Sequence, residues 1–374
     1  MKQVLDRELI FIQSTHGDAH QFGRYNDIKG IYERSKLLGF ERDYYEAVSH
    51  ANNISLGFIQ HGSYCNRVVT YLRALKTING CVVDYRNTDI YFYSLDFLPF
   101  LIFFRLRRCR LILEMPDLRD VFFGDSVRSR VVRLAVRLMI SFLNNIVFTS
   151  DRYVTYLKSK SIKHNLSIVI ENKVRLSGIN NHKNTRKGSL ARGKIVIGYF
   201  GLLRCETSLR VLLNVLEASE GLELIVYGYF MNINEILQYK FTTNSKVSYR
   251  GTYISPDNLS AMYEQVDVSW ICYPYSDSLE GNYRLARTNR YYEAGHFMKP
   301  MIAAKGTADA DRVEELNCGV IVDYDDFEAT LKSFSLICRE NIEIWRANLF
   351  NLSKTYFKSS DCDYSELFYV LGQE

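Results

Sequence analysis

Short apolar segments rich in β-branched residues alternate with amphipathic segments along the second half of the chain. Apolar residues in the intervening segments recur at helical spacing, which is typical of helices that pack on a sheet. This alternation, with short turns, predicts parallel strands joined by right-handed crossover helices in a doubly wound α/β domain. Ser255 and Pro256 predict the start of one helix, as its N-cap and first residue. Strands are expected at 194–200, 223–228, 246–251, 267–273, 300–304 and 319–324.

The first half repeats the pattern less regularly, with strands expected at 8–14, 81–85, 89–94, 110–115, 145–150 and 166–171. A polar, basic segment without periodicity, 177–193, is typical of a linker. The chain has 374 residues, more than one hydrophobic core usually supports. The sequence therefore predicts an α/β fold with two doubly wound Rossmann-like domains that face a central cleft. Their expected bounds are 1–176 and 194–340, and helices in 341–374 are expected to pack back on the first domain.

Composition places the chain among soluble globular proteins, with 47% hydrophobic and 24% charged residues. Its eight cysteines form no Cys-x-x-Cys pair, so reduced thiols are expected. The first residues lack the apolar core of a signal peptide, and the longest apolar run, 97–104, is too short to cross a bilayer. These features predict a cytoplasmic protein.

Positive charge is concentrated in two stretches, although the net charge is only +5. Segments 104–110 and 126–142 hold eight arginines and no acidic residue. Arg130, Arg133 and Arg137 recur at helical spacing between aliphatic residues, which predicts an amphipathic basic helix. Such a helix either contacts an anionic membrane surface or a phosphorylated acceptor, or is a solvated helix packed on a sheet. No nucleic-acid partner is expected, because no recognisable nucleic-acid-binding module accompanies the arginines.

A single helical turn near position 290 collects three polar side chains. The i, i+3 and i+4 spacing brings Asn289, Arg290 and Glu293 close together at the start of a helix. One interpretation is a solvated first turn in which Glu293 compensates the helix dipole. The other interpretation is that these three polar side chains bind a nucleotide. The neighbouring motifs help to decide between the two interpretations.

Four segments of the second half resemble motifs of the GT-B glycosyltransferases, in particular the large retaining group called family 4. Segment 197–213 resembles the strand, glycine loop and helix that open the donor domain, and 222–228 resembles its next strand. Segment 247–275 is similar to the stretch that follows, and 288–304 to the element that binds the donor nucleotide. The resemblance extends over about 193–325, with the four motifs in the expected order.

The resemblance implies a function and a donor site. Gly201 would lie in the glycine loop, and Arg204 and Arg290 would bind the diphosphate of a nucleotide sugar. Asn289 would begin the nucleotide-binding helix, and Glu293, as an exposed carboxylate, would accept hydrogen bonds from the ribose. The implied activity is transfer of a sugar, with retention, to a glycan acceptor, expected to be lipid-linked, in cell-surface polysaccharide or lipopolysaccharide assembly. This activity is compatible with a peripheral location on the inner face of the cytoplasmic membrane. No cofactor besides the nucleotide-sugar co-substrate is expected.

The chain departs from the family pattern at three places. Leu285 stands eight positions before Glu293, where many relatives carry a glutamate. The sequence Cys-Glu-Thr-Ser, 205–208, replaces the usual Lys-Gly after the phosphate loop. Met298 or Lys299 stands where the last motif has glycine.

Other polar residues near expected strand ends are weaker candidates for catalysis. His16 follows the first strand and Asp117 follows the strand at 110–115, so both are candidate catalytic residues of the first domain. Asp309 and Asp311 resemble the metal-binding Asp-x-Asp of another transferase fold, but their place at a helix start favours exposed capping. No metal is therefore expected.

Two other function classes remain open. The second hypothesis is another GT-B nucleotide-sugar enzyme, such as an inverting transferase or an epimerase. Such an enzyme would need a histidine or carboxylate as catalytic base in the first half of the chain. The third possibility is a non-catalytic nucleotide-sugar-binding protein, which Leu285 and the absent lysine favour. Release of free sugar from a nucleotide sugar distinguishes the enzymes from the binding protein.

Overall fold

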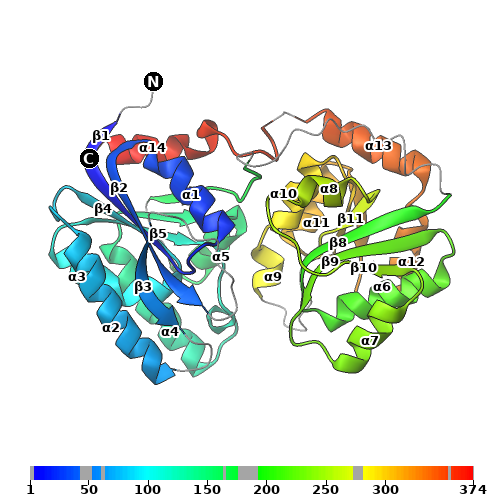
Figure 1. The fold of residues 1–374 in the computed structure, drawn as a ribbon, viewed down its shortest axis with the longest axis horizontal. Coiled ribbons are helices and arrows are strands. Elements are labelled where there is room, and N and C mark those ends of the chain that lie inside the picture. The colour runs from blue at the N-terminus through cyan, green and yellow to red at the C-terminus, as the bar shows by residue number, and fades with distance from the viewer. Residues whose placement is uncertain are drawn as a thin grey trace. The chain divides into compact units, whose positions relative to one another are not determined.

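Two compact units make up the chain in the computed structural model (Figure 1). The first contains residues 1–171 and 360–374, and the second contains residues 172–359. Each has one parallel sheet with helices on its two faces, so the two Rossmann-like α/β domains predicted from the sequence are confirmed. The predicted linker lies outside the described residues, except for Gly193. Those residues are 4–42, 53–59, 64–162, 166–175, 193–272, 281–352 and 355–373.

Seven parallel strands form the sheet of the first unit, in the order β3-β2-β1-β4-β5-β6-β7. The chain runs outward from β1 to β3 and then, from β4 to β7, in the opposite direction. The strand order therefore reverses between β1 and β4. The strands are β1 Leu5–Gln13, β2 Tyr32–Arg42, β3 Asn53–Ile59, β4 Thr88–Tyr93, β5 Arg110–Met115, β6 Asn145–Phe148 and β7 Ser167–Val169.

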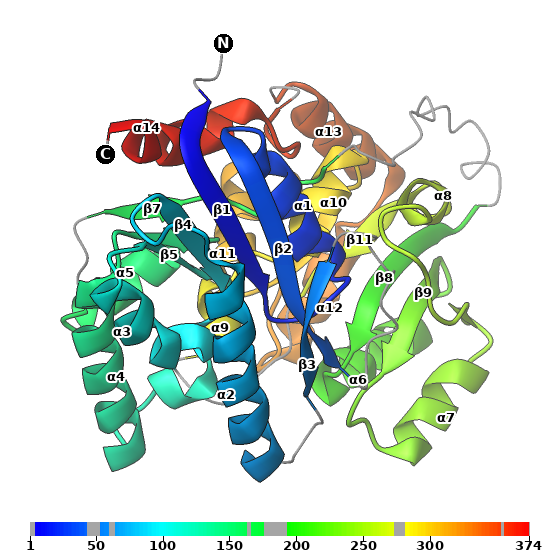
Figure 2. The same ribbon diagram turned by 60° about the vertical axis from the view of Figure 1, so that its left-hand side comes forward.

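Helices cover both faces of this sheet because the buried strand residues point alternately to either side. Tyr91 of β4 belongs to the core under α1 and α14, whereas the next residue, Phe92, packs against Phe104 of α3. Tyr71 of α2 lies 5.7 Å from Phe100 of α3, ring centre to ring centre, and α3 packs on α4. Helices α2, α3 and α4 thus lie together (Figure 2). The helices are α1 Ala19–Lys29, α2 Tyr64–Cys81, α3 Leu98–Leu106, α4 Val127–Met139, α5 Asp151–Ser159 and α14 Ser365–Gln373.

Six parallel strands form the sheet of the second unit, in the order β10-β9-β8-β11-β12-β13. All six strands expected in this half are present. The order reverses between β8 and β11, the two central strands. The strands are β8 Ile195–Leu203, β9 Leu222–Phe230, β10 Val247–Tyr249, β11 Val268–Trp270, β12 Met301–Ala304 and β13 Gly319–Val322.

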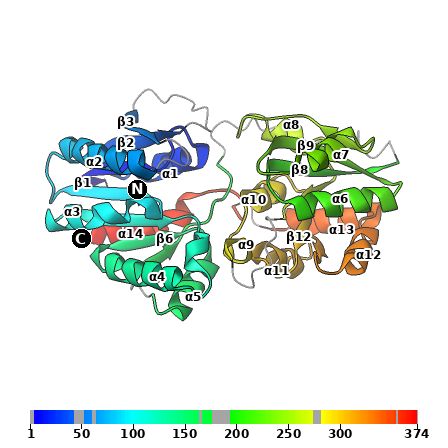
Figure 3. The same cartoon turned by 90° about the horizontal axis from the view of Figure 1, so that it is seen from below.

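Two separate hydrophobic clusters hold the helices of the second unit against its sheet. One cluster joins α6, α7, α12 and the start of α13, and the other joins α8, α10 and α11. Figure 3 shows α6, α12 and α13 grouped together, apart from α10 and α11. The helices are α6 Glu206–Ala218, α7 Glu235–Thr243, α8 Leu259–Tyr263, α9 Asn282–Leu285, α10 Asn289–His296, α11 Ala308–Glu315, α12 Phe327–Ser335 and α13 Arg339–Phe350.

Two local predictions from the sequence are wrong, and two strands were missed. No strand forms at 81–85, because Cys81 ends α2 and the next residues are a loop. Strands β2 and β3 were not predicted, because polar residues occupy the first half of β2 and hide its apolar second half. Ser255 does not cap a helix: α8 begins at Leu259, and its N-cap residue Asn258 accepts a 2.8 Å hydrogen bond from the Ile254 amide.

The C-terminal tail is shared between the two units. Ile342 and Trp345 of α13 lie in the core of the second unit, whereas Leu367 and Leu371 of α14 lie in the core of the first. Residues 341–359 therefore differ from the prediction, which placed the whole tail on the first domain.

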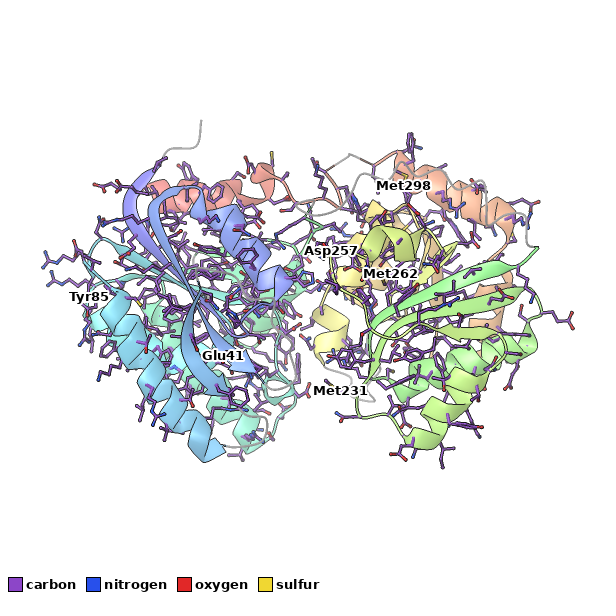
Figure 4. All side chains as sticks on the ribbon, viewed as in Figure 1. Glu41, Tyr85, Met231, Asp257, Met262 and Met298 are labelled. Carbon is purple, nitrogen blue, oxygen red and sulfur yellow. The ribbon has the colours of Figure 1, made fainter. Side chains whose placement is uncertain are left out.

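Helix α10 ends in a backbone conformation that normally requires glycine. Met298, labelled in Figure 4, is the first residue beyond the C-cap. Its φ is 53°, in the region that favours glycine at this position. The amide of the next residue, Lys299, donates to the Ala294 carbonyl at 2.8 Å and closes the turn. Of the two positions considered for the glycine of the resembled motif, Met298 and Lys299, the backbone therefore favours Met298.

Replacing Met298 by glycine is expected to raise the free energy of unfolding of the second unit by about 1 kcal/mol, because an L side chain in this region is strained. Urea denaturation followed by tryptophan fluorescence measures it, since Trp270 and Trp345 both lie in the second unit. Asn317→Gly is the control. Asn317, the first residue beyond the C-cap of α11, has φ 43°, a conformation that asparagine tolerates, so little change is expected. Equal increases in the free energy of unfolding from Met298→Gly and Asn317→Gly would contradict the claim that the Met298 backbone is strained.

Candidate functional site

The candidate donor site lies where the strand order of the second unit reverses. In open α/β sheets, ligands bind outside the carboxyl ends of the strands at this point. Gly201 and Leu203 end β8, and α10 contacts the adjacent strands β11 and β12. Four predicted donor residues, Gly201, Arg204, Asn289 and Arg290, are carried by these elements or follow them.

Glycines allow the ends of β8 and β9 to approach each other closely. Gly201 and Gly228 are paired across the two strands and have φ values of 103° and 145°. A Cβ atom on Gly228 would lie 1.7 Å from the Gly201 carbonyl oxygen, so only glycine fits there. A Cβ atom on Gly201 would lie 3.8 Å from the Tyr253 hydroxyl oxygen. Tyr253 therefore lies beside the glycine turn.

Arg290 places a guanidinium group over the central strand of the sheet. Its central carbon, Cζ, lies 5.4 Å from the centre of the buried Tyr199 ring of β8. Its Nη1 atom is buried and has no hydrogen-bond partner among the described residues. A buried, unsatisfied N–H group of a cation is unfavourable unless a ligand accepts its hydrogen bond. Arg290 is thus the best-placed cation for an anionic ligand at this switch point.

Glu293 lies one turn after Arg290 and is buried, with only 7% of its surface exposed. Its Oε2 atom accepts a 3.1 Å hydrogen bond from the Tyr263 hydroxyl of α8. Burial raises the pKa of Glu293, and the Tyr263 hydrogen bond and the Arg290 charge oppose this rise. The expectation of an exposed carboxylate is wrong, because the side chain is buried beside Tyr263 and Tyr253, which come from other parts of the chain.

Asp309 is also buried, contrary to the expectation of an exposed capping residue. Only 3% of its surface is exposed, and its Oδ2 atom accepts a 2.7 Å hydrogen bond from the Thr288 hydroxyl. Thr288 in turn is the N-cap of α10, and its hydroxyl oxygen accepts from the Tyr291 amide. Burial raises the pKa of Asp309 to about 6. Asp309 therefore stabilises the N-terminus of α10. Asp311, in contrast, is exposed.

Arg204 and Asn289 lie at the N-terminal ends of two helices. Arg204 is exposed and directly precedes Cys205, the N-cap residue of α6. Asn289 is half-buried and is the first residue of α10. Within the described residues, no group of three or more His, Cys, Asp or Glu side chains is arranged to hold a metal ion.

Tyrosines and one further arginine around this site were not predicted. Tyr253 is near enough to Glu293 and Arg290 to interact with both charges. The guanidinium carbon of Arg287 lies 5.2 Å from the centre of the Tyr291 ring, and Nη1 donates to the Ala308 carbonyl at 3.5 Å. The only signal in the sequence was the large number of tyrosines, 27, which does not identify individual positions.

The two candidate residues of the first unit follow different strands. His16 is half-buried in the turn after β1, and its amide donates to the Phe40 carbonyl at 2.7 Å. Asp117 is exposed after β5 and accepts a 3.3 Å hydrogen bond from the Tyr153 hydroxyl. Strand β4 separates the two strands that precede them.

Charged residues that the sequence did not identify link the strand ends near His16. Asp96, just after β4, forms an ion pair with Arg119, and the Arg42 Nη2 atom lies 3.9 Å from its Oδ2 atom. The Arg42 Nε atom donates to the Ser14 carbonyl at 3.1 Å. These contacts connect residues beyond β1, β2, β4 and β5 at the switch point of the first sheet.

The three arginines of α4 do not share one exposed face. Arg130 and Arg137 are exposed. Arg133 turns inward, where its Nη1 atom donates to the carbonyls of Phe122, at 2.9 Å, and Gly124, at 2.7 Å. The predicted contact role of Arg133 is therefore replaced by a role in holding the loop before α4. No helix of the described chain is long and apolar enough to span a bilayer.

No protein-family profile matches the chain. Among curated proteins it is similar to the succinoglycan biosynthesis protein ExoL of Rhizobium meliloti, with 23% identity over 310 residues. That alignment covers 79% of this chain and 76% of the relative.

Solved structures with the same fold match almost the whole chain. Anabaena HepE in complex with UDP and glucose matches with a TM-score of 0.69 and 14% identity, over 98% of this chain and 100% of the other. Sucrose-phosphate synthase of Thermosynechococcus elongatus matches with a TM-score of 0.66 and 14% identity, over 98% of both chains. A trehalose-phosphate synthase of Burkholderia xenovorans matches with a TM-score of 0.63 and 10% identity, over 92% and 95%. The chain has the GT-B fold of these structures.

Proposed function

We propose that the chain is a glycosyltransferase that moves a sugar from a nucleotide-diphosphate sugar to a glycan acceptor. The observation that carries the proposal is the placement of Arg290 and Glu293 one turn apart on α10, at the switch point of a GT-B fold. An unsatisfied guanidinium N–H and a carboxylate one turn apart provide the two groups that a nucleoside diphosphate needs. The complex of HepE with UDP-glucose supports UDP-glucose as the first donor to test.

Each donor residue has a distinct role in this proposal. Arg290, and Arg204 from the loop before α6, bind the diphosphate and balance the charge that develops as the glycosidic bond breaks. The N-terminus of α10, beginning at Asn289, adds partial positive charge. Glu293 accepts hydrogen bonds from the ribose hydroxyls, and Gly201 lets the donor approach the backbone at the end of β8.

The acceptor is proposed to be a lipid-linked glycan in cell-surface polysaccharide assembly, and the reaction to proceed with retention, as in family 4. The relative named for succinoglycan biosynthesis supports the pathway class. A trehalose-6-phosphate synthase studied for glycosyltransfer with retention, with a TM-score of 0.62, supports the stereochemistry. A peripheral position on the inner face of the cytoplasmic membrane would bring such an acceptor to the first unit, where His16 and Asp117 are candidate catalytic residues.

One feature favours a second function, a nucleotide-sugar-binding protein without transferase activity. Leu285 ends the short helix α9, at the position where many family 4 enzymes have a glutamate. Release of free glucose from UDP-glucose by the purified protein would exclude this alternative. Absence of both hydrolysis and transfer, together with tight UDP binding, would support it.

UDP is expected to raise the melting temperature of the protein, and an excess of EDTA is expected to leave the rise unchanged. At about a hundred times its Kd, a ligand that binds only the folded state stabilises it by about 2.7 kcal/mol. Arginine side chains and a helix terminus, rather than a divalent ion, are proposed to hold the diphosphate. A thermal-shift series with UDP, GDP, ADP and CDP, with and without EDTA, identifies the base. A shift that needs magnesium or manganese would refute the metal-independent site.

A further inference from the structure

Helix α4 exposes a continuous stripe of aliphatic side chains. Val127, Val131, Leu134 and Leu138 follow the spacing i, i+4, i+7 and i+11, which places them on one side of a helix with 3.6 residues per turn. Each of the four has between 56% and 77% of its surface exposed. Exposed aliphatic residues are common one at a time, but four in a row along one helix form a patch that favours an interaction.

The opposite side of α4 anchors the helix to the first unit, so the stripe points outward. Ser129 donates from its hydroxyl to the Phe123 carbonyl at 2.9 Å, and Val136 is buried. Arg133, on the same side, holds the carbonyls of Phe122 and Gly124. The stripe is thus fixed in its orientation by polar and apolar contacts on the far side of the helix.

Three arginines border the stripe. By helical spacing Arg128 lies on one flank, and Arg130 and Arg137 lie on the other. All three are exposed, and neither α4 nor the neighbouring α3 contains an acidic residue. Ile102 and Leu106 of α3, which packs on α4, are also exposed.

We propose that α4 docks the first unit on an anionic lipid bilayer by inserting this aliphatic stripe among the acyl chains, while the flanking arginines contact the headgroups. This inference rests on the proposed lipid-linked acceptor and identifies the surface that brings the protein to it. It differs from docking by charge alone, because Arg133 is turned inward and the outermost side chains are apolar. A helix with an apolar stripe and basic flanks is suited to lie in the plane of a membrane interface.

Charge favours a bilayer over a second copy of the chain as the occupant. A two-fold contact through the stripe would bring the arginines of both copies together without an acidic residue on α3 or α4 to balance them. An anionic headgroup layer balances them on both flanks at once.

Cosedimentation with phosphatidylcholine vesicles, with and without phosphatidylglycerol, tests the inference with the full-length protein. The wild-type chain is expected to bind the anionic vesicles at low and at high salt, because salt screens the arginines but not the buried aliphatic area. The double variant L134Q/L138Q is expected to lower the partition coefficient at least about tenfold at both salt concentrations. Glutamine keeps helix propensity, so the variant should fold.

Matched variants separate the two contributions. R130Q/R137Q is expected to weaken binding only at low salt and only with phosphatidylglycerol. Ile236→Gln, at an exposed position of α7 in the second unit, is expected to bind like the wild type. Wild-type binding to neither vesicle, or equal binding by L134Q/L138Q, would overturn the proposal.

Two further measurements keep the outcomes distinct. If analytical ultracentrifugation shows a dimer that L134Q/L138Q dissociates, the stripe is a subunit interface and the proposal is wrong. The UDP-induced rise in melting temperature is expected to be the same in wild type and in L134Q/L138Q. If UDP does not raise the melting temperature of the wild type, the donor site is refuted. If UDP does raise it but the wild type binds no vesicles, only the docking surface is refuted.

Discussion

Replacing Glu293 by alanine is expected to weaken UDP binding about 5- to 150-fold, the equivalent of roughly 1–3 kcal/mol. The carboxylate is proposed to accept hydrogen bonds from the ribose, and alanine provides no acceptor. Isothermal titration with UDP measures the loss. Because Glu293 is buried and bonded to Tyr263, the alanine variant is also expected to be less stable, by about 1–3 kcal/mol from the unpaired Tyr263 hydroxyl.

Two variants separate ligand binding from stability at this position. Tyr263→Phe removes the same internal hydrogen bond but keeps the carboxylate, so UDP affinity should change much less than in Glu293→Ala. Glu293→Gln keeps an acceptor for Tyr263 and is expected to preserve stability while losing affinity. If a folded Glu293→Ala protein binds UDP like the wild type, Glu293 does not belong to the donor site.

Replacing Arg24 by alanine is expected to destabilise the first unit by about 3–5 kcal/mol, because it leaves a buried charge without its partner. Arg24 and Glu114 have no exposed side-chain surface, and the Arg24 Nη2 atom lies 3.0 Å from the Glu114 Oε1 atom. Nη1 donates to the Tyr364 hydroxyl at 2.9 Å, and Nη2 donates to the Ile170 carbonyl at 2.8 Å. One guanidinium thus connects α1, β5, the residue before α14 and the segment after β7.

The location of the tryptophans gives this experiment an internal control. Urea unfolding followed by far-ultraviolet circular dichroism should show an earlier transition for the first unit. Fluorescence of Trp270 and Trp345 should keep its midpoint, because both lie in the second unit. Arg34→Ala, at an exposed position of β2, is the matched surface control, and a change within about 0.5 kcal/mol is expected. Equal stability of Arg24→Ala and Arg34→Ala would contradict the role of the buried pair.

The strands of the second unit could be predicted from the sequence because, apart from the short edge strand β10, they are apolar runs bounded by turn residues. Parallel strands covered on both faces have this continuous apolar pattern. Strand β2 escaped prediction because its exposed first half, with Glu33 and Arg34, lacks the pattern, although Leu38 and Phe40 in its second half are buried. Its place in the sheet depends on pairing with β1 and β3, which local sequence does not encode.

The site was predictable in its residue types but not in its environment. Helical spacing placed Arg290 and Glu293 together, and the structure keeps them one turn apart. Burial of Glu293 depends on Tyr263, which is 30 positions away, and burial of Asp309 depends on Thr288, 21 positions away. Such contacts arise only when the chain is folded, so the expectation of exposed carboxylates was wrong at both positions. The inward orientation of the Arg133 side chain could not be predicted for the same reason, because it depends on contacts with the Phe122 and Gly124 carbonyls.

The return of α14 to the first unit has a consequence for synthesis on the ribosome. A nascent chain emerges from its N-terminus, so the second unit, a continuous segment, is available for folding before the last residues of the first unit exist. Two partners of the first unit are translated after the whole second unit. Tyr364 bonds Arg24, and the Leu371 carbonyl accepts a 2.7 Å hydrogen bond from Arg110. The guanidinium groups of Arg24 and Arg110 therefore obtain their full set of partners only after the second unit and α14 have been translated. The first unit is therefore completed only in nascent chains whose translation has passed beyond the second unit.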